Sequence, residues 1–274
     1  MPLVNEQARI IENECVGPRL YLMVLEAPQI AKAIEPGQFV HVRLPGMPDH
    51  ILRRPFSVYA TNPATNTIDI LYQTVGYGTD FMTTLSADGG ALSEVEVLGP
   101  VGRRWMPPEH TKRALLVGGG VGAAPLYMLA EQLVETRVHT DVILGAQTEQ
   151  ALVCRGRYEV LLSQGTADQV APLCSTDDGS FGRAGFATSL VAEALEAAAQ
   201  AGMQYDYVAV CGPEPLMHAV ADLCAGANVM CEVSMERRMA CGIGACLSCV
   251  VETTEGKQRA CVDGPVFDAT KVVW

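Results

Sequence analysis

The 274-residue sequence has no run of roughly 18 consecutive apolar residues, so we expect no membrane-spanning helix. Basic residues are also scarce, since 19 Lys and Arg stand against 31 Asp and Glu, for a formal charge of −12. Nucleic-acid binding needs clustered basic residues, so nucleic acid is not an expected partner. The first residues, MPLVNEQARIIENE, lack the basic flank and apolar stretch of an export signal. We therefore expect a cytoplasmic protein.

Ten cysteines are present, and in a reducing compartment they are not expected to form disulfides. Cysteines grouped in such a chain indicate metal or redox chemistry. Six others are scattered, and we expect them to be small buried hydrophobic residues. These six are Cys15, Cys154, Cys174, Cys211, Cys224 and Cys231.

The sequence pattern predicts an α+β multidomain protein with three parts. Residues 1–107 contain short alternating runs at 39–44, 67–72 and 94–98, separated by Pro and Gly, which is typical of an antiparallel β-barrel. Residues 108–228 alternate apolar strands with helical stretches, which predicts a doubly wound parallel sheet. Its strands are expected at 114–117, 141–144 and 207–210, and its helices at 124–136, 151–162, 189–201 and 215–225. Residues 229–274 hold the cysteine group and form a small C-terminal domain.

A glycine-rich loop follows the first strand of the central part, where RALLV runs into GGGVGAAPLYML. Glycines such as Gly119, Gly120 and Gly122 let the backbone approach a pyrophosphate at the start of a helix. Pro125 stands where the dinucleotide motif usually has its last glycine. The loop indicates a dinucleotide site, with a simple tight turn as the alternative.

A second loop supports this interpretation, because Cys211, Gly212 and Pro213 follow the strand at 207–210. Ligands of such sheets bind at the carboxyl ends of the strands. Cys211 either approaches a nicotinamide ring or is a buried thiol. The sequence GAQT at 145–148 offers no arginine to a 2′-phosphate, although Arg155 and Arg157 follow, so NAD is favoured over NADP.

The stretch RRPFSVYA at 53–60 resembles the ferredoxin-reductase superfamily, in which an Arg-x-aromatic-Ser strand of an antiparallel barrel holds FAD. The resemblance implies that Arg54 contacts the pyrophosphate, and that Pro55, Phe56 and Ser57 line the flavin. A guanidinium fork suits diphosphate oxygens. The alternative is an arginine pair on a solvated strand.

A second flavin motif is LYQTVGYGTDFM at 71–82. The same resemblance implies that Leu71, Tyr72 and Gln73 lie beside the flavin. It also implies that Gly78 and Thr79 cap a helix against the pyrophosphate. Thr79 is a suitable helix N-cap even without a ligand.

The grouped cysteines are Cys241, Cys246, Cys249 and, eleven residues later, Cys261. This C-x4-C-x2-C spacing with a distant fourth cysteine is typical of plant-type [2Fe-2S] clusters. Soft thiolates suit iron, and the small residues between them leave room for backbone amides. Zinc is the alternative, but structural zinc sites usually use two C-x-x-C pairs and only one is present.

The C-terminal block, MERRMACGIGACLSCVVET followed by ACVDGPVFDATKVVW, resembles the electron transfer subunits of NAD-dependent dihydroorotate dehydrogenase B. The resemblance implies a relay in pyrimidine biosynthesis, from FMN in a separate catalytic subunit through [2Fe-2S] and FAD to NAD⁺. It also implies a heterotetramer with two copies of each subunit, and no catalytic base in this chain.

Two other functions are compatible with the motifs. An NAD(P)H-ferredoxin or hydrogenase-type reductase subunit would use the same FAD and cluster residues. A zinc-stabilised scaffold without cofactors would be colourless and free of iron.

Overall fold

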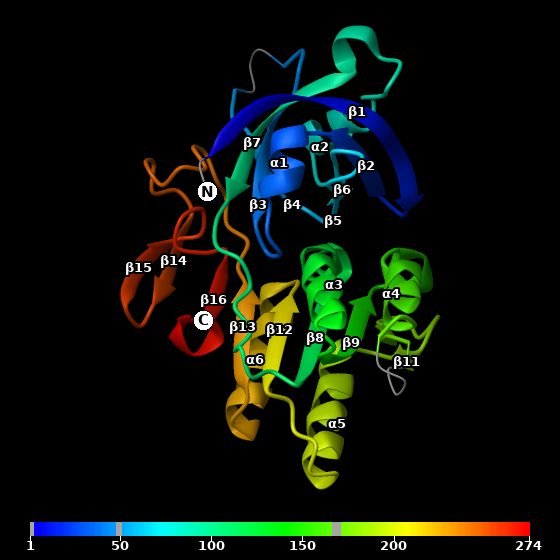
Figure 1. Cartoon of the computed structure of the whole chain (residues 1–274), viewed down its shortest axis with the longest axis vertical. Coiled ribbons are helices and arrows are strands. Elements are labelled where there is room, and N and C mark those ends of the chain that lie inside the picture. The colour runs from blue at the N-terminus through cyan, green and yellow to red at the C-terminus, as the bar shows by residue number, and fades with distance from the viewer. Residues whose placement is uncertain (1–2, 48–50, 166–170) are drawn as a thin grey trace. The chain divides into compact units, whose positions relative to one another are not determined.

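The structure is a computed structural model that describes residues 3–47, 51–165 and 171–274. It divides the chain into two compact units (Figure 1). Unit 1 comprises Met1–Arg104, Glu236–Val251 and Lys257–Pro265, and unit 2 comprises Trp105–Met235, Glu252–Gly256 and Val266–Trp274. Within the described ranges, no helix combines the length and apolar character needed to cross a membrane.

Unit 1 is built on a seven-stranded antiparallel sheet in the order β4-β3-β7-β1-β2-β6-β5. Its strands are β1 (Val4–Gly17), β2 (Leu20–Glu26), β3 (Phe39–Arg43), β4 (Arg54–Ser57), β5 (Ala60–Asn62), β6 (Thr67–Gln73) and β7 (Glu94–Val101). Its helices are α1 (Pro28–Ala33), α2 (Tyr77–Met82) and the 3₁₀ turn η1 (Gly90–Leu92). The strands predicted at 39–44, 67–72 and 94–98 are therefore confirmed.

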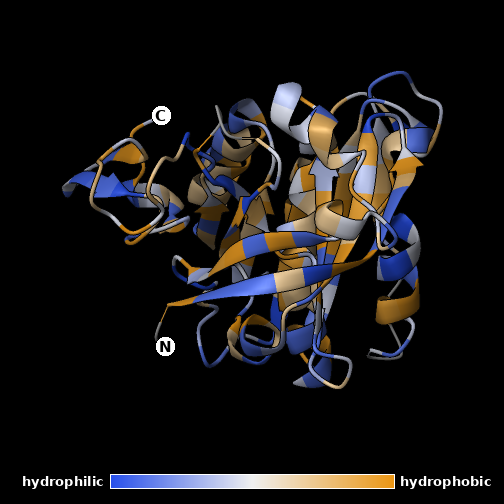
Figure 2. Ribbon diagram, turned by 90° about the horizontal axis from the view of Figure 1, so that it is seen from above, coloured by the Kyte–Doolittle hydropathy of each residue, from blue (hydrophilic) through white to orange (hydrophobic). Residues whose placement is uncertain are grey.

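The sheet of unit 1 is curled, and irregular pairing between its strands contributes to the curl. β1 is 14 residues long, and its pairing with β2 shifts register twice, between Ile10 and Glu12 and between Cys15 and Gly17. Such irregularities increase local twist. Burial alternates along the first half of this strand, which starts beside the N label in Figure 2: Ala8 and Ile10 are buried, whereas Arg9 between them is exposed. One face of the sheet thus forms the apolar core of unit 1.

The predicted barrel is present as an open, curled sheet and differs from a closed barrel. The sheet ends at β4 on one edge and at β5 on the other, and the described strands include no ladder joining these two edges. Side chains close the gap instead, because the rings of Phe56 in β4 and Tyr72 in β6 meet edge to face with centroids 6.1 Å apart.

Unit 2 is built on a second seven-stranded sheet, in the order β11-β10-β9-β8-β12-β13-β16. Its strands are β8 (Arg113–Gly119), β9 (His139–Ala146), β10 (Leu173–Thr176), β11 (Arg183–Ala184), β12 (Tyr207–Cys211), β13 (Met230–Ser234) and β16 (Val266–Asp268). Its helices are η2 (Gly120–Leu126), α3 (Tyr127–Glu135), η3 (Glu149–Ala151), α4 (Arg155–Leu162), α5 (Ala187–Gln200), α6 (Glu214–Ala227) and η4 (Ala269–Lys271).

The sheet of unit 2 is parallel except for β16, which confirms the predicted doubly wound architecture. Helix α3 packs on α4, and α5 packs on α6. Right-handed crossovers place these two pairs on opposite faces, because the strand order runs outward in both directions from the β8–β12 pair. That pair is the switch point at which such sheets bind ligands, at the carboxyl ends of the strands.

Two strands of this sheet come from the stretch 229–274, which the sequence pattern assigns to the cluster domain. β13 pairs in parallel with β12, and β16 pairs antiparallel with β13. The buried carboxylate of Glu232 in β13 explains part of this placement. It accepts hydrogen bonds from the Tyr207 hydroxyl at 2.5 Å and the Met106 backbone N–H at 2.8 Å. Burial raises the pKa of Glu232 above its usual value.

Helix α3 begins later than expected, because a 3₁₀ turn occupies the first part of the stretch predicted at 124–136. Gly120 has a positive φ of 57°, and Pro125 lies inside the turn η2. Proline lacks the backbone N–H that a regular helix needs, so the α-helix starts at Tyr127. Similarly, α4 starts at Arg155, after the separate turn η3.

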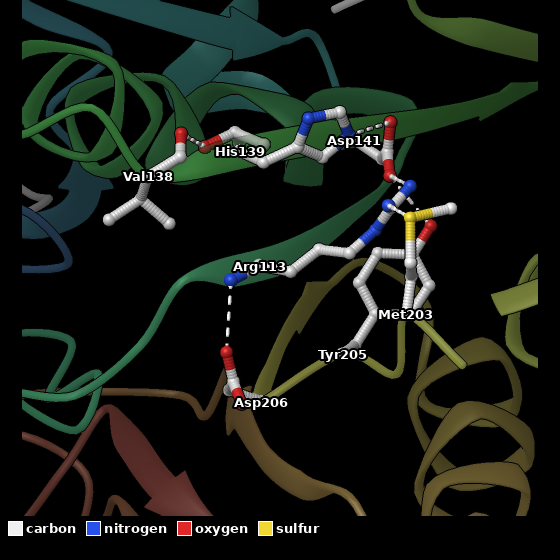
Figure 3. Close-up of polar contacts among 8 residues, drawn as sticks. Arg113, Val138, His139, Asp141, Met203, Tyr205 and Asp206 are labelled. Atoms are coloured by element: carbon white, nitrogen blue, oxygen red, sulfur yellow. Dashed lines mark hydrogen bonds and ion pairs between the residues drawn. The ribbon is translucent and has the colours of Figure 1, made fainter. Parts of the chain in front are cut away.

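A polar network fixes the amino ends of β8 and β9 (Figure 3). The Asp141 carboxylate accepts from Arg113 Nη2 at 2.8 Å and from the Tyr205 hydroxyl at 2.7 Å. Asp206 accepts from the backbone N–H of Arg113 at 3.0 Å. A cavity of about 340 Å³ lies beside this network. It is at the opposite ends of the strands from the glycine loop, so it is separate from the predicted nucleotide site.

The remaining strands, β14 (Val250–Thr253) and β15 (Gly256–Arg259), form a two-stranded sheet. Five of the six scattered cysteines are buried, which confirms their expected role as small hydrophobic residues. Cys15 is exposed, so that expectation is wrong for this residue. It lies where the register of β1 shifts, and the irregular pairing there turns its thiol outward.

Candidate cofactor sites

Strand β4 carries the first predicted flavin motif at an edge of the unit 1 sheet. Its four residues, Arg54 to Ser57, are all half-buried, so both faces of the strand are partly accessible. An edge strand also presents backbone N–H and C=O groups to a ligand. The sequence RPFS therefore forms an accessible rim rather than part of a closed core.

Arg54 lies against Gly78 at the start of helix α2. A Cβ atom at position 78 would overlap the Arg54 guanidinium, so any larger residue there would displace this side chain. Burial lowers the pKa of Arg54 below its usual value, but arginine remains charged at neutral pH. Among the residues that the structure describes, no carboxylate pairs with Arg54 in the way that Glu96 pairs with Arg53. A half-buried cation of this kind suits the diphosphate of a dinucleotide.

Thr79 occupies a different helix position from the one expected. The N-cap of α2 is Gly76, and Thr79 is the third residue of the helix. Its hydroxyl accepts from the backbone N–H groups of Val75 at 2.8 Å and Gly76 at 3.2 Å, and donates to the Gly76 carbonyl at 2.9 Å. Thr79 therefore stabilises the turn that presents Gly78, and its hydroxyl is already in use.

The three predicted flavin residues of β6 have different surroundings. Tyr72 is buried, stacks on Tyr21 with centroids 5.5 Å apart, and donates its hydroxyl to Asn13 at 3.0 Å. Leu71 is also buried, whereas Gln73 is exposed. Tyr72 therefore supports the sheet, and Gln73 is the side chain of the three that is open to a ligand.

The two predicted nucleotide loops meet at the carboxyl ends of β8 and β12. A Cβ atom at Gly122 would lie 2.5 Å from the carbonyl oxygen of Cys211. A Cβ atom at Gly119 would lie 2.6 Å from Leu216 and 3.0 Å from Pro213. Gly212 has a φ of 155° and a Cβ there would meet Gly119. The glycines are thus required because two backbones pack together at the switch point.

The other nucleotide candidates lie in the same loops but do not all face a ligand. Pro125 is buried, and its carbonyl accepts the Trp105 indole N–H at 3.1 Å. The Cys211 thiol is buried and lies 3.9 Å from the carbonyl oxygen of Ser234 in β13. Its contact is therefore with the neighbouring strand, as in the buried-thiol alternative.

The four grouped cysteines lie in unit 1 and form two pairs. Cys249 Sγ and Cys261 Sγ are 3.3 Å apart. In the other pair, the backbone N–H of Cys246 donates to Cys241 Sγ at 3.4 Å. Across the described residues, no three His, Cys, Asp or Glu side chains are close enough together to hold a single metal ion. The four thiols supply the donor set that a [2Fe-2S] cluster needs, with the sulfurs of Cys249 and Cys261 already adjacent.

The surroundings of the cysteines favour bound metal. Hydrogen bonds, chiefly from the Ser248 hydroxyl 3.2 Å away, lower the pKa of the exposed Cys246 thiol to about 6. Burial, together with the Cys249 thiol, raises the pKa of Cys261 to about 12. Ligands of a metal must be deprotonated, so metal binding at Cys261 would displace its proton. The Ile243 backbone N–H also points at Cys241 Sγ, at 3.5 Å.

Glycines shape the cysteine loop in the way the small-residue pattern predicts. Gly242 and Gly244 have positive φ values of 70° and 82°. A Cβ at Gly244 would lie 2.7 Å from Val262. Arg259 joins the loop to the turn that carries Cys261, since it donates to the Gly244 carbonyl at 3.3 Å and pairs with Asp263 at 3.0 Å.

Sequence reasoning missed the residues that hold this loop. Arg259 and Ser248 carry no motif signal of their own. His41 belongs to an alternating run and was expected at a polar strand position, yet it is fully buried. Its Nε2 lies 3.3 Å from the sulfur of Met239, two residues before the first cysteine. That contact spans 198 positions, so no local pattern reveals it.

The curled antiparallel sheet with a half-buried arginine on its edge, the parallel sheet with its glycine crevice and the paired cysteines define a ferredoxin-reductase-like oxidoreductase with an iron–sulfur segment. Residues 236–273 match the iron–sulfur cluster binding domain of dihydroorotate dehydrogenase B. Residues 116–222 match the oxidoreductase NAD-binding domain. Matches in both units therefore support this class of oxidoreductase.

Curated relatives are similar over nearly the whole chain. The electron transfer subunit of dihydroorotate dehydrogenase B (NAD(+)) from Desulforamulus reducens is 35% identical, covering 97% of this chain and 97% of the relative. The subunit of the same name from Bacillus caldolyticus is 36% identical, with 98% of each covered. This chain belongs to the family of dihydroorotate dehydrogenase B electron transfer subunits.

Solved structures support the fold. The NADH-dependent reduced ferredoxin-NADP oxidoreductase, studied for flavin-based electron bifurcation, has a TM-score of 0.79 and 27% identity. That similarity covers 97% of this chain and 90% of the other. The ferredoxin reductase of carbazole 1,9a-dioxygenase has a TM-score of 0.67 and 18% identity, covering 84% of this chain and 67% of that one, and shows the fold alone.

Proposed function

We propose that this chain carries electrons from the FMN of a dihydroorotate dehydrogenase catalytic subunit, through a [2Fe-2S] cluster and FAD, to NAD⁺. The reaction belongs to pyrimidine biosynthesis, and we place it in the cytoplasm. The observation that carries the proposal is the pairing of Cys241 with Cys246 and of Cys249 with Cys261, inside the segment that matches the family's cluster-binding domain.

The rim formed by β4 and helix α2 is the proposed FAD site. A bound flavin supplies the step between single electrons and a two-electron hydride. Arg54 would hold the diphosphate over Gly78, and Phe56 would line the ring from the same side of β4, beside Gln73. Pro55 and Ser57 would line it through the backbone of this edge strand. Phe56 is fixed in place by its edge-to-face contact with Tyr72.

The crevice formed by Gly119, Gly120, Gly122, Gly212 and Pro213 is the proposed NAD site. Its close-packed backbones orient N–H groups towards a pyrophosphate. NAD is preferred to NADP, because the residues that follow β9, GAQT at 145–148, offer no arginine to a 2′-phosphate. Arg155, further along the chain, pairs with Glu159 at 3.4 Å and stacks on Phe181 at 4.2 Å.

The face around the cysteine loop is the proposed docking site for the catalytic subunit. Three large apolar side chains are exposed there: Ile243 by 55%, Leu247 by 62% and Val262 by 40%. Leu247 also has a positive φ of 58°, an unfavourable conformation for a leucine. An exposed apolar patch beside a redox centre suits a permanent protein interface. We expect two catalytic and two electron transfer subunits in the complex.

Co-expression with the dihydroorotate dehydrogenase catalytic subunit of the same organism tests the function. The expected result is co-purification of a complex that contains FMN, FAD, iron and sulfide and reduces NAD⁺ with dihydroorotate. A complex that reduces a ferredoxin but not NAD⁺ would favour the ferredoxin-reductase alternative. A colourless chain containing zinc and no iron would contradict both.

A further inference from the structure

His41 connects the flavin strand to the cysteine loop within unit 1. It lies in β3 directly opposite Pro55 of β4. Directly paired residues of neighbouring strands share a face of the sheet, so the His41 ring and the Pro55 ring lie on one side. Successive residues of a strand alternate in direction, so Arg54 and Phe56 point to the other side.

The cysteine loop packs on the His41 side. A Cβ atom at Gly242 would lie 2.9 Å from His41 Cε1 and 3.0 Å from both ring nitrogens. The edge of the imidazole that carries its nitrogens therefore faces the residue next to Cys241. His41 Nε2 also contacts the Met239 sulfur at 3.3 Å, on the other side of Cys241. The ring thus touches the loop on both sides of the first cysteine.

Burial determines the protonation state of the His41 ring. His41 is 0% exposed, and its Nδ1 has no hydrogen-bond partner among the described residues. Burial, with a smaller effect of the Arg53 charge, lowers the pKa of His41 to about 4, so the ring is neutral at physiological pH. Methionine sulfur only accepts hydrogen bonds, so Nε2 is the nitrogen that donates. A leucine would fill this apolar position without leaving a buried polar atom unpaired, so packing alone does not explain the histidine.

We propose that His41 is a positioning residue for electron transfer, whose ring sets how closely the cysteine loop approaches the back of the flavin strand. The inference rests on the proposed function. The Arg54 side of β4 and the Met239 to Gly242 side of His41 are separated by one layer of sheet. In the proposed relay, electrons passing between the two cofactors would cross this layer, and the rate of transfer would depend steeply on its geometry. The residue that spaces the loop from the strand therefore controls the rate.

The test compares His41→Leu with His41→Gln in the purified holoprotein. Glutamine places an amide nitrogen near the position of Nε2 and can still donate to Met239, whereas leucine cannot. NADH is mixed anaerobically with each protein, and flavin and cluster reduction are followed separately by visible absorbance and by EPR of freeze-quenched samples. Iron, sulfide and FAD contents are measured on the same samples. His110→Leu, at an exposed position of unit 2, is the control.

We expect His41→Leu to slow cluster reduction by at least about ten-fold and to shift the EPR signal, while flavin reduction by NADH stays unchanged. We expect His41→Gln to remain within about two-fold of the wild type. An unchanged cluster signal and rate in His41→Leu would overturn the inference and leave the proposed function intact. A wild-type protein whose flavin, but not cluster, accepts electrons from NADH would overturn the proposed function itself.

Met239→Leu removes the same contact from the side of the loop. It tests the positioning role of His41 even if His41→Leu does not fold. The swap nearly conserves volume but removes the sulfur acceptor. We expect a shifted midpoint potential and EPR signal of the cluster, with flavin content unchanged. Met106→Leu, at an exposed position, is the matched control. If Met239→Leu gives the same potential and signal as the wild type and the Met106→Leu control, the inference is wrong.

Discussion

The cysteine loop and the glycine crevice are both rich in glycine, but for different reasons. In the crevice, Gly119 ends strand β8 and Gly122 lies in the turn η2 that follows, and neighbouring backbone or packed side chains exclude a Cβ at both. In the cysteine loop, Gly242 and Gly244 have positive φ and face the side chains of His41 and Val262. The crevice is therefore built by the sheet itself, whereas the loop is held by side chains and thiols.

This difference indicates which of the two regions needs its cofactor to keep its structure. The crevice lies on fully buried strands, and each buried valine or leucine in β8 contributes about 1.5–3 kcal/mol. The loop has no helix or strand between Ala240 and Cys249. We expect the crevice to persist without nucleotide and the loop to need metal for its structure.

The largest effect is expected from Cys249→Ser in the buried pair. A serine hydroxyl is a poor ligand for iron, so iron and acid-labile sulfide should fall to background, while FAD stays bound. Metal analysis and the visible spectrum of the purified protein measure this. Cys15→Ser, outside the pairs and exposed, should keep its full iron content. A Cys249→Ser protein with full iron content would mean that the loop does not depend on these thiolates.

A large effect is also expected from Arg54→Ala, which removes the cation over Gly78. Losing a charge-assisted hydrogen bond costs about 1.5–3 kcal/mol, so FAD affinity should fall by about ten-fold or more. Arg54→Lys should recover only part of it, because lysine lacks the planar fork. FAD titration followed by flavin fluorescence measures both. Arg9→Ala, which breaks an exposed ion pair with Glu26, is the control and should bind FAD normally.

Gly122→Ala and Gly120→Ala sharpen the comparison within the crevice. The first puts a Cβ 2.5 Å from the Cys211 carbonyl and should lower the free energy of unfolding by about 3 kcal/mol and weaken NADH binding. The second meets open space, and its positive φ of 57° should cost only about 1 kcal/mol. Urea unfolding and NADH titration of both variants are the measurements. Equal losses in the two would show that backbone packing is not what requires the glycines.

A smaller effect is expected from the buried neutral ring of His41. Because its folded pKa of about 4 lies below the usual 6.5, the unfolded chain binds more protons between these values, and stability falls as pH falls through that window. Between pH 7 and pH 5 the loss from this group is about 2 kcal/mol. Urea unfolding at both pH values should show that His41→Gln lacks this part of the pH dependence. An identical pH dependence in the variant would contradict the burial of a neutral ring.

The sequence predicted most of both sheets, because alternation and apolar runs are local signals. The strands at 39–44, 67–72 and 114–117 were found in this way. It did not place β13 and β16 in the unit 2 sheet, since both are short and close in sequence to the cysteines. Whether such a strand joins one sheet or another depends on partners such as Tyr207, far away along the chain.

The site shows the same division between local and distant signals. The four cysteines are recognisable from spacing alone and Gly122 from the glycine-rich run around it, whereas Gly78 was assigned through the family resemblance. Thr79 was assigned the wrong helix position, because the helix begins at Tyr77 after the glycine at position 76. His41 was missed because its burial is produced by the loop at 239–242, which only the folded chain brings to β3.

The measurement that tests the account most directly is an anaerobic NADH titration of the purified holoprotein, followed by EPR and visible absorbance. The account predicts bound FAD, two irons and two sulfides per chain, as expected for one [2Fe-2S] cluster, and a reduced-cluster EPR signal that appears as the flavin accepts electrons. A protein that binds FAD and reacts with NADH but gives no cluster signal, or that holds zinc in place of iron, would contradict it.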